Sequence, residues 1–485
     1  MRHEPDIAAD TRATARDATT SRDATLSRER SIPREPGVRS VRSLLRKLAG
    51  NAVVLAHLPG QQRIPYAPRA RIEALRDARV RATVRYAART VPFYRDTFRK
   101  LGVDPASITT ARDLARLPLI DKDDLRRDPE RFRSTSRAGR NALLFLSSGS
   151  TGKPGQIWHD RRSLLANVAY GERERRVVTT LLGRRLGYRE VGIGYRGGTI
   201  DLVRAFYAES TLLARPTRRK LSVLAPLAAN VAALNEFRPD VLATFGNYLA
   251  ALSRAVARGD AKLVPPKVIT YGAESLDREA RLEIERTLGA PVISFYNSVE
   301  AFKIAFLCEA RSRFHLHEDL CHVRIVDADG RDVPRGERGT VVISNLVNRG
   351  TVLLNYRLND VASFASGACP CGRTLDALAE IDGRVEDVLE RPGGRVLHPR
   401  GIWGAVKQFP EIVQYQLVQT APHAFVLRLV TRDEEDYRRV ADAAARALES
   451  VLGAPAQVTT ERHERLAGER SGKVRLVVAL PHGAA

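Results

Sequence analysis

The sequence has few of the residues that mark several common classes of protein. It holds 4 cysteines, 1 methionine and 2 tryptophans among 485 residues. So few cysteines exclude the disulfide framework of a small secreted protein, and they favour metal binding or plain burial instead. The sequence has no apolar run long enough to span a bilayer, and its first residues have no apolar core typical of a secretion signal. We therefore expect a cytoplasmic protein without a membrane partner.

Lysine is also scarce, although the chain is basic. Of the 79 Lys and Arg residues only 10 are lysines, and the net charge is +23. Two of these lysines, Lys153 and Lys473, lie in glycine-containing motifs. The arginines are spread along the chain among acidic residues, without a zinc-finger spacing or a concentrated basic arm, which argues against a nucleic-acid partner. A polyphosphate ligand or an acidic carrier protein fits the positive charge equally well.

The composition divides the chain into three parts. Residues 1–40 have almost no large apolar side chains, so we expect a disordered tail. Residues 41–384 are predicted to form a large domain and residues 385–485 a small α+β domain, because 485 residues exceed one compact domain. In the small domain, helical spacing of apolar residues predicts a helix over 434–452.

The large domain is predicted to be of the α/β class, with largely parallel strands and an antiparallel subdomain. Apolar runs with helical stretches between them indicate parallel strands; these runs cover 142–146, 268–271 and 292–296. Residues 323–327 and 339–344 are separated by an Asp-Gly turn and predict a hairpin.

The most specific motif, SSGSTGKP, directly follows the first of these runs. Glycines, hydroxyl residues and one lysine form a loop whose N–H groups can surround a polyphosphate. The candidate residues are Ser147, Ser148, Gly149, Ser150, Thr151, Gly152 and Lys153. It is not a Walker A loop, because Ser147 and Pro154 stand where that motif needs Gly and a hydroxyl residue.

This motif resembles the phosphate loop of the adenylate-forming superfamily of acyl-CoA synthetases, luciferases and adenylation domains. RYAARTVPFYRDTF (85–98) and DLARLPLIDKDDL (113–125) resemble the phenylacetate-CoA ligase branch and its capsule-biosynthesis relatives. The resemblance runs from about residue 41 to 479. It implies a large N-terminal domain with mixed, largely parallel sheets and a small, mobile C-terminal lid.

The resemblance also implies a nucleotide site. YGAESL (271–276) would lie beside the adenine through Gly272, Ala273 and Glu274. In FYNSVE (295–300), Tyr296 would pack on the adenine and Glu300 would hold Mg2+, an ion that prefers oxygen ligands. This segment departs from the family at Asn297, which replaces a glycine, and at Val299, which replaces a hydroxyl residue.

Further motifs appear in the family's order. Asp360, at the end of NYRLND, would accept hydrogen bonds from both ribose hydroxyls, and Arg384 of the DGR motif would also reach the ribose. Glu386 and Asp387 would form the hinge of the C-terminal lid. Lys473 would bind the carboxylate and the α-phosphate during adenylation.

One further loop bears on the acid substrate. GIGYRGGTI (192–200) resembles the glycine-rich segment of the aryl-acid ligases, where Tyr195 would line the acid pocket. An exposed loop is an equally good interpretation of this segment.

The cysteines suggest a metal site. Cys308, His315, Cys369 and Cys371 can make a closed tetrahedral Zn2+ site, and several phenylacetate-CoA ligase relatives have a similar set. From spacing alone, His317 or Cys321 can replace His315, and free buried cysteines remain the simpler alternative.

The sequence therefore predicts an ATP-dependent enzyme that activates a carboxylic acid as acyl-AMP and transfers it to coenzyme A. A second interpretation keeps adenylation but transfers the acyl group to a carrier-protein thiol or an amine, as in antibiotic or capsule assembly or deazaflavin-coenzyme modification. A third is a catalytically weak nucleotide-binding or scaffold protein. The sequence does not reveal the acid or the oligomeric state.

Overall fold

We describe the fold from a computed structural model. It describes residues 41–147, 155–194, 197–212, 217–274, 276–384, 389–391, 395–397, 402, 405–406, 408–409, 411–466 and 477–478. The predicted tail and the predicted hinge residues Glu386 and Asp387 lie outside these ranges. The domain boundary at 384/385 stays a prediction. No helix within the described ranges is long and apolar enough to cross a membrane.

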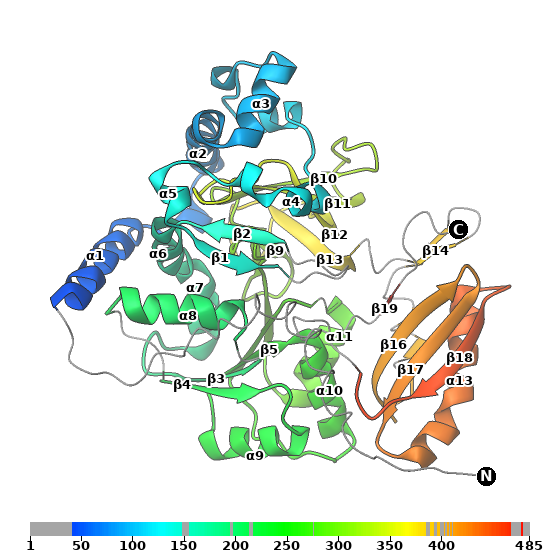
Figure 1. Cartoon of the computed structure of the whole chain (residues 1–485). Coiled ribbons are helices and arrows are strands. Elements are labelled where there is room, and N and C mark those ends of the chain that lie inside the picture. The colour runs from blue at the N-terminus through cyan, green and yellow to red at the C-terminus, as the bar shows by residue number, and fades with distance from the viewer. Residues whose placement is uncertain are drawn as a thin grey trace, which may run out of the picture. The chain divides into compact units, whose positions relative to one another are not determined.

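Among the described residues, helices precede the first strand, helices and strands alternate over residues 143–296, and strands follow one another from 305 to 384 (Figure 1). In chain order the helices are α1 Val41–His57, α2 Arg69–Thr90, α3 Pro92–Leu101, α4 Lys122–Arg127, α5 Arg137–Arg140, α6 Arg161–Tyr170, α7 Glu172–Leu182, α8 Thr199–Ser210, α9 Leu227–Phe237, α10 Gly246–Ala257, α11 Arg278–Leu288 and α13 Glu434–Leu452. Short 3-10 turns occupy Ile64–Tyr66, Pro105–Ser107, Arg112–Arg116 and Pro129–Phe132.

The strands form four sheets. Their bounds are β1 Leu143–Leu146, β2 Gln156–His159, β3 Arg189–Gly194, β4 Thr217–Ser222, β5 Val241–Phe245, β6 Val268–Gly272, β7 Val292–Tyr296, β8 Ala305–Leu307, β9 Phe314–Leu316, β10 Cys321–Val326, β11 Arg338–Asn345, β12 Tyr356–Phe364, β13 Ala377–Arg384, β14 Leu389–Arg391, β15 Arg395–Leu397, β16 Ile412–Ala421, β17 Ala424–Thr431, β18 Gln457–Arg462 and β19 Val477–Val478.

The main sheet has 11 strands in the order β10-β11-β12-β13-β9-β8-β7-β6-β5-β3-β4. Strands β4, β3, β5, β6 and β7 run parallel, whereas the strands from β8 to β10 pair antiparallel. Strands β3, β5, β6 and β7 are buried along most of their length, as a sheet covered by helices requires, whereas the edge strand β4 has no buried residue. The predicted mixed α/β fold with an antiparallel subdomain is confirmed.

One strand prediction is wrong. The run at 142–146 does not join the parallel sheet, because β1 pairs antiparallel with β2 in a separate two-stranded sheet. Exposure alternates along β1: Phe145 is 2% exposed, whereas Leu144 and Leu146 are 44% and 52% exposed. A strand with one covered face cannot lie inside a sheet that is buried on both faces, and a short apolar run does not distinguish the two cases.

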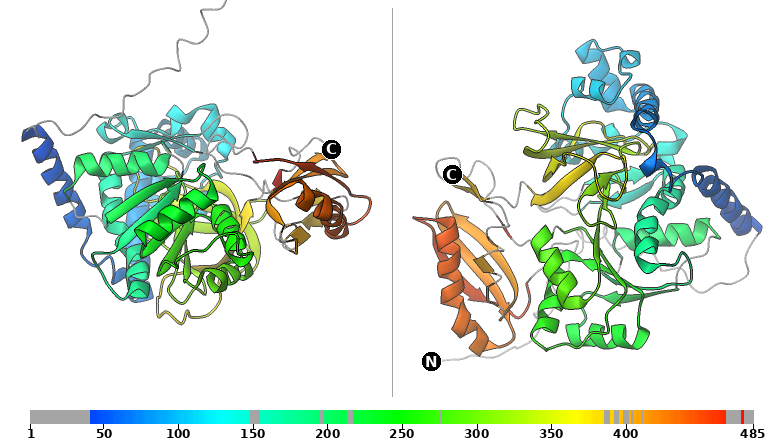
Figure 2. Two further views of the ribbon diagram at one scale, coloured as in Figure 1. Left: turned by 90° about the horizontal axis from the view of Figure 1, so that it is seen from below. Right: turned by 180° about the vertical axis from the view of Figure 1, so that it is seen from behind.

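The C-terminal unit has its own core. Its four-stranded sheet has the order β18-β17-β16-β19, and α13 packs along one face of it (Figure 2). Helix α13 covers the predicted residues, and the side chain of Asp433 caps it by accepting from Asp436 N at 2.8 Å. The prediction of a separate small α+β unit is confirmed.

Buried ion pairs connect the helices to the turn between β9 and β10. The side chains of Arg173 in α7 and Asp319 are both 0% exposed and form two hydrogen bonds, of 2.6 and 2.9 Å. Arg79 of α2 donates to the same carboxylate at 2.7 Å. Burial alone would raise the pKa of Asp319, but the two guanidinium groups outweigh it and hold the pKa well below its usual range.

Replacement of Asp319 by Ala should strongly destabilise the fold, because it leaves Arg173 buried without a counter-charge. We expect a loss of about 3–5 kcal/mol in the free energy of unfolding, measured by urea denaturation at neutral pH. The exposed pair of Asp329 and Arg331 provides a matched control, and Asp329→Ala should cost less than about 1 kcal/mol. Because the folded-state pKa of Asp319 is depressed, its contribution should be lost as the pH falls below about 4. Equal losses in the two variants would contradict a special role for the buried carboxylate.

Candidate nucleotide site and cysteine–histidine cluster

The candidate nucleotide site lies at the carboxyl edge of the parallel strands. Gly272 ends β6 and Tyr296 ends β7, and these strands are neighbours in the sheet. A Cβ on Gly272 would lie 3.2 Å from the Phe295 carbonyl oxygen, so this position favours glycine. Ala273 follows with a φ of 69°, which turns the chain away from the strand. Open α/β sheets bind ligands at this edge.

Tyr296 and Asp360 meet across the sheet. The Tyr296 hydroxyl donates a hydrogen bond of 2.5 Å to Asp360 Oδ2, although the two residues are 64 positions apart. Asp360 lies on β12, and its register partner on β13 is Arg384. Asn359, directly before Asp360, has a φ of 64°, in the left-handed region that asparagine tolerates better than most residues. The structure thus brings together the residues predicted for the adenine and the ribose.

Side-chain amides hold the main chain of the segment after Tyr296 in place. Asn297 can donate its amide N–H groups to the carbonyl oxygens of Phe302 at 2.5 Å and Tyr296 at 3.1 Å, which gives this non-glycine residue a local structural role. Glu300 is 8% exposed, and its carbonyl accepts from Asn345 Nδ2 at 2.9 Å. The carboxylate predicted to hold Mg2+ therefore projects from a fixed backbone.

Glu274 has a contact that the sequence did not predict. Its Oε2 accepts from Asn247 N at 2.6 Å, at the start of α10. A carboxylate at a helix N-terminus satisfies a free N–H group and interacts favourably with the helix dipole. Glu274 therefore joins the end of β6 to the helix that follows β5.

The predicted phosphate loop is described only at its two ends. Ser147 N donates to Gly155 O at 2.9 Å, and Gly155 N donates to Ser147 Oγ at 3.0 Å. These two bonds close the β1–β2 hairpin. Several predicted residues lie outside the described ranges, namely Ser148, Gly149, Ser150, Thr151, Gly152, Lys153, Tyr195 and Lys473.

Sequence reasoning missed His159, the last residue of β2. Its Nε2 donates to Val299 O at 2.7 Å, and its ring packs against Phe302 at a tilt of 35°, with 4.2 Å between centroids. Burial lowers the pKa of His159 to about 4, so the ring is neutral at physiological pH. A single histidine after a strand gives no signal in the sequence, because its partner is a main-chain carbonyl 140 residues away.

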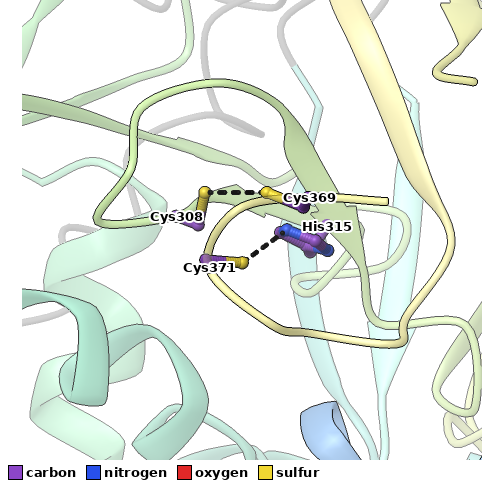
Figure 3. Close-up of side chains that lie close together, drawn as sticks. All are labelled: Cys308, His315, Cys369 and Cys371. Carbon is purple, nitrogen blue, oxygen red and sulfur yellow. Dashed lines mark hydrogen bonds between the residues drawn. The ribbon is translucent and has the colours of Figure 1, made fainter. Parts of the chain in front are cut away.

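The predicted metal ligands form one cluster. Cys308, His315, Cys369 and Cys371 point toward one another from two loops and a strand, and their ligand atoms all lie within 4.8 Å of one another (Figure 3). The Cys308 and Cys369 sulfur atoms are 3.7 Å apart, and Cys371 Sγ is 3.2 Å from His315 Nε2. Zn–S bonds of about 2.3 Å in a tetrahedron separate two sulfurs by about 3.8 Å, so the donor set fits zinc.

The surroundings of the cluster also suit a metal. The hydrogen bond between Cys308 and Cys371 lowers the pKa of Cys308 and raises that of Cys371, so in the absence of a metal one thiol of the pair donates to the other's thiolate. The other ring nitrogen of His315, Nδ1, faces Leu375 O at 3.4 Å, an arrangement that orients ligating histidines. The alternatives His317 and Cys321 are not members of this cluster.

Comparisons with known proteins show which sequences the chain is similar to. No protein-family model matches the chain. The chain is 29% identical over 370 residues to phenylacetate-coenzyme A ligase of Thermus thermophilus, which covers 72% of this chain and 79% of that protein. It is 26% identical over 333 residues to the enzyme of the same name from Escherichia coli, covering 66% of this chain and 72% of that protein.

Solved structures show the same fold. The crystal structure of 2-hydroxyisobutyryl-CoA ligase in the postadenylation state with R3-HIB-AMP matches with a TM-score of 0.68 at 20% identity, over 86% of this chain and 91% of that chain. An open conformation of that enzyme with 2-HIB-AMP and CoA matches with a TM-score of 0.55 at 20% identity, over 86% and 93% of the two chains.

The chain therefore has the fold of the adenylate-forming ligases. In sequence it is similar to the phenylacetate-coenzyme A ligases. The resemblance that the motifs indicated is confirmed.

Proposed function

We propose that the protein is an AMP-forming acid–coenzyme A ligase. A carboxylate attacks the α-phosphate of ATP, giving an acyl-adenylate and releasing pyrophosphate. The thiol of coenzyme A then attacks the acyl carbon, gives up its proton, forms the thioester and releases AMP. The observation that carries this proposal is the contact of Tyr296 with Asp360 beside Gly272, in a chain similar to phenylacetate-coenzyme A ligases.

The residues of this chain would serve the first step by binding and orientation. Asp360 would accept from the ribose hydroxyls, and Tyr296 would cover the adenine while its hydroxyl fixes that carboxylate. Glu300 would hold Mg2+, whose charge neutralises the phosphates. Lys473 would contribute a positive charge where the α-phosphate is attacked. Closure of the C-terminal unit would bring Lys473 to the site.

The proposal also extends to the identity of the acid substrate and of the acyl acceptor. An aryl acid and coenzyme A are the first choices, because the relatives are named phenylacetate-coenzyme A ligases. An acidic carrier protein or an amine is the alternative acceptor, and the charge of +23 suits an acidic carrier. Acid-dependent pyrophosphate exchange over a panel of aryl and aliphatic acids identifies the acid. Consumption of coenzyme A then distinguishes it from carrier-protein loading or amide formation.

Replacement of Asp360 by Ala should raise the KM for ATP about 10- to 100-fold in pyrophosphate exchange. The lost charged hydrogen bonds to the ribose are worth about 1.5–3 kcal/mol. The KM for the acid should stay near the wild-type value, and the surface variant Asp329→Ala should change neither constant. An unchanged KM for ATP in Asp360→Ala would remove this residue from the nucleotide site.

Replacement of Lys473 by Ala should slow acyl-adenylate formation by about 100-fold or more, because its charge is needed where the α-phosphate is attacked. Thioester formation from supplied acyl-AMP should be spared. Single-turnover assays of the two half-reactions measure the difference. Equal loss in both would contradict a role confined to adenylation.

We also propose that the cysteine–histidine cluster holds one structural Zn2+. A closed set of four protein ligands leaves no open position for chemistry. The metal would tie the loop after β8 to the loop before β13, so it would support the sheet without touching substrate. Cys308 and His315 are 0% and 1% exposed, which agrees with a structural site.

Purified protein should hold about one Zn2+ per chain by elemental analysis, and Cys371→Ser should lose most of it. Cys321→Ser is the matched control, because this cysteine is buried outside the cluster and should leave the metal in place. Chelation should lower the melting temperature, since the folded chain binds the metal far better than the unfolded chain. If the protein is purified without metal and chelation leaves its stability unchanged, the zinc site is wrong and the cysteines are simply buried apolar residues.

A further inference from the structure

The β1–β2 hairpin has no ladder partner in the main sheet. It forms its own two-stranded sheet, and its ends, Ser147 and Gly155, flank the predicted phosphate loop. A two-stranded hairpin is marginally stable by itself. Contacts other than strand pairing must therefore set its position relative to Glu300.

A main-chain bond of 2.7 Å from Thr351 N to Trp158 O and the packing of Phe145 on Phe302 supply some of these contacts. A buried set of polar side chains supplies others, and we call it the polar brace. Its members are His159, Asp160, Asn345, Asn348 and Thr351. Each is at most 5% exposed. Buried polar groups that are satisfied by specific partners fix one geometry, because every alternative leaves a donor or acceptor unpaired.

One part of the brace forms hydrogen bonds with the end of β2 and the residue after it. Asn348 Nδ2 donates to Trp158 O at 2.8 Å, and Thr351 Oγ1 accepts from Trp158 N at 2.8 Å. Asp160 N donates to Asn348 Oδ1 at 3.1 Å, and Asp160 Oδ2 accepts from Arg349 N at 2.7 Å. The backbones approach so closely that a Cβ on Gly350 would lie 2.2 Å from Trp158 O.

The other half holds the segment of Glu300. Asn345 Nδ2 donates to Glu300 O at 2.9 Å, while its Oδ1 accepts from Asn348 N at 3.0 Å. His159, at the end of β2, contacts the same segment directly through its hydrogen bond of 2.7 Å to Val299 O. Among the described residues, side-chain hydrogen bonds thus join the hairpin to the Glu300 segment directly through His159 and indirectly through the two asparagines.

We propose that His159, with Asn345 and Asn348, is a positioning residue that fixes the spacing between the hairpin ends and the Glu300 carboxylate, and so sets the affinity for the Mg2+-bound polyphosphate of ATP. This inference rests on the proposed function. The brace binds the backbone of both phosphate-side segments, whereas strand pairing in the main sheet places Tyr296 and Asp360. It should therefore act on the triphosphate rather than on the nucleoside or the acid.

Two variants of His159 separate its hydrogen bond from its packing. His159→Phe keeps an aromatic ring against Phe302 but loses the donor to Val299 O, whereas His159→Gln keeps an Nε2 donor. In His159→Phe we expect the KM for ATP to rise about three- to tenfold, the effect of one lost hydrogen bond. The KM for the acid should not change, and His159→Gln should restore most of the loss. AMP, which lacks the β- and γ-phosphates, should lose less affinity than Mg2+·ATP in titration calorimetry.

A stability control distinguishes positioning from general destabilisation. Tyr94 is fully buried and its hydroxyl accepts from Leu354 N at 2.7 Å, so Tyr94→Phe also removes a core hydrogen bond. It should lower the melting temperature without changing the KM for ATP.

The outcomes are separable. A wild-type KM for ATP in His159→Phe, or equal effects on ATP and acid that follow the melting temperature, overturns the positioning role. If the wild type shows no acid-dependent pyrophosphate exchange, the proposed function fails. The positioning role is then judged by Mg2+·ATP binding alone: weaker binding in His159→Phe supports it, whereas unchanged binding or none in the wild type overturns it.

Discussion

The buried carboxylate of Asp319 is the constraint on which the arrangement around the main sheet depends. It pairs with Arg173 of α7 and Arg79 of α2, two helices far apart in the chain. Its neighbour Glu318 accepts two hydrogen bonds from Arg69 at the start of α2, of 2.5 and 2.6 Å. Such pairs give little net stability compared with apolar packing, but an unpaired member is costly. They therefore specify one docking of the helices, and the turn between β9 and β10 becomes a fixed point.

The residues of the candidate site are held in place in two different ways, some by strand pairing and others by side-chain hydrogen bonds. The residues proposed for the adenine and the ribose belong to strands of the main sheet, so ladder hydrogen bonds place Gly272, Tyr296 and Asp360. The hairpin end at His159 lies outside the sheet and depends on side-chain hydrogen bonds. In the proposed site the nucleoside half thus has the rigidity of the main sheet, while the phosphate half depends more on a few buried polar groups. Substitutions in the brace are therefore expected to lower mainly the affinity for the phosphates of ATP.

Much of this could be predicted from the sequence, and the failures have a common cause. Local signals located the strand β7 and the helix α13, because periodicity and turn chemistry are local. The motifs predicted that Tyr296 and Asp360 belong to one site, and the two side chains are in contact. His315, the histidine predicted to join three cysteines, lies in their cluster. The partner of β1 and the contact of His159 with Val299 were missed, because partners distant in sequence leave no local pattern. The cap formed by Glu274 was missed because its partner is a main-chain N–H on another element.

The brace also bears on whether the departures at Asn297 and Val299 would abolish ATP use. The glycine that Asn297 replaces is compensated locally, since the asparagine amide can bind two carbonyl oxygens of its own segment. The hydroxyl that the resemblance expects in place of Val299 would make one hydrogen bond to a charged phosphate, and its loss is worth about 1.5–3 kcal/mol, or roughly a 10- to 150-fold loss of affinity. The larger electrostatic contributions proposed for Lys473 and a Glu300-bound cation do not depend on that side chain. The backbone of Val299 is still held in place by His159. Weakened but sustained nucleotide binding follows from these magnitudes, and this favours a working ligase over a scaffold.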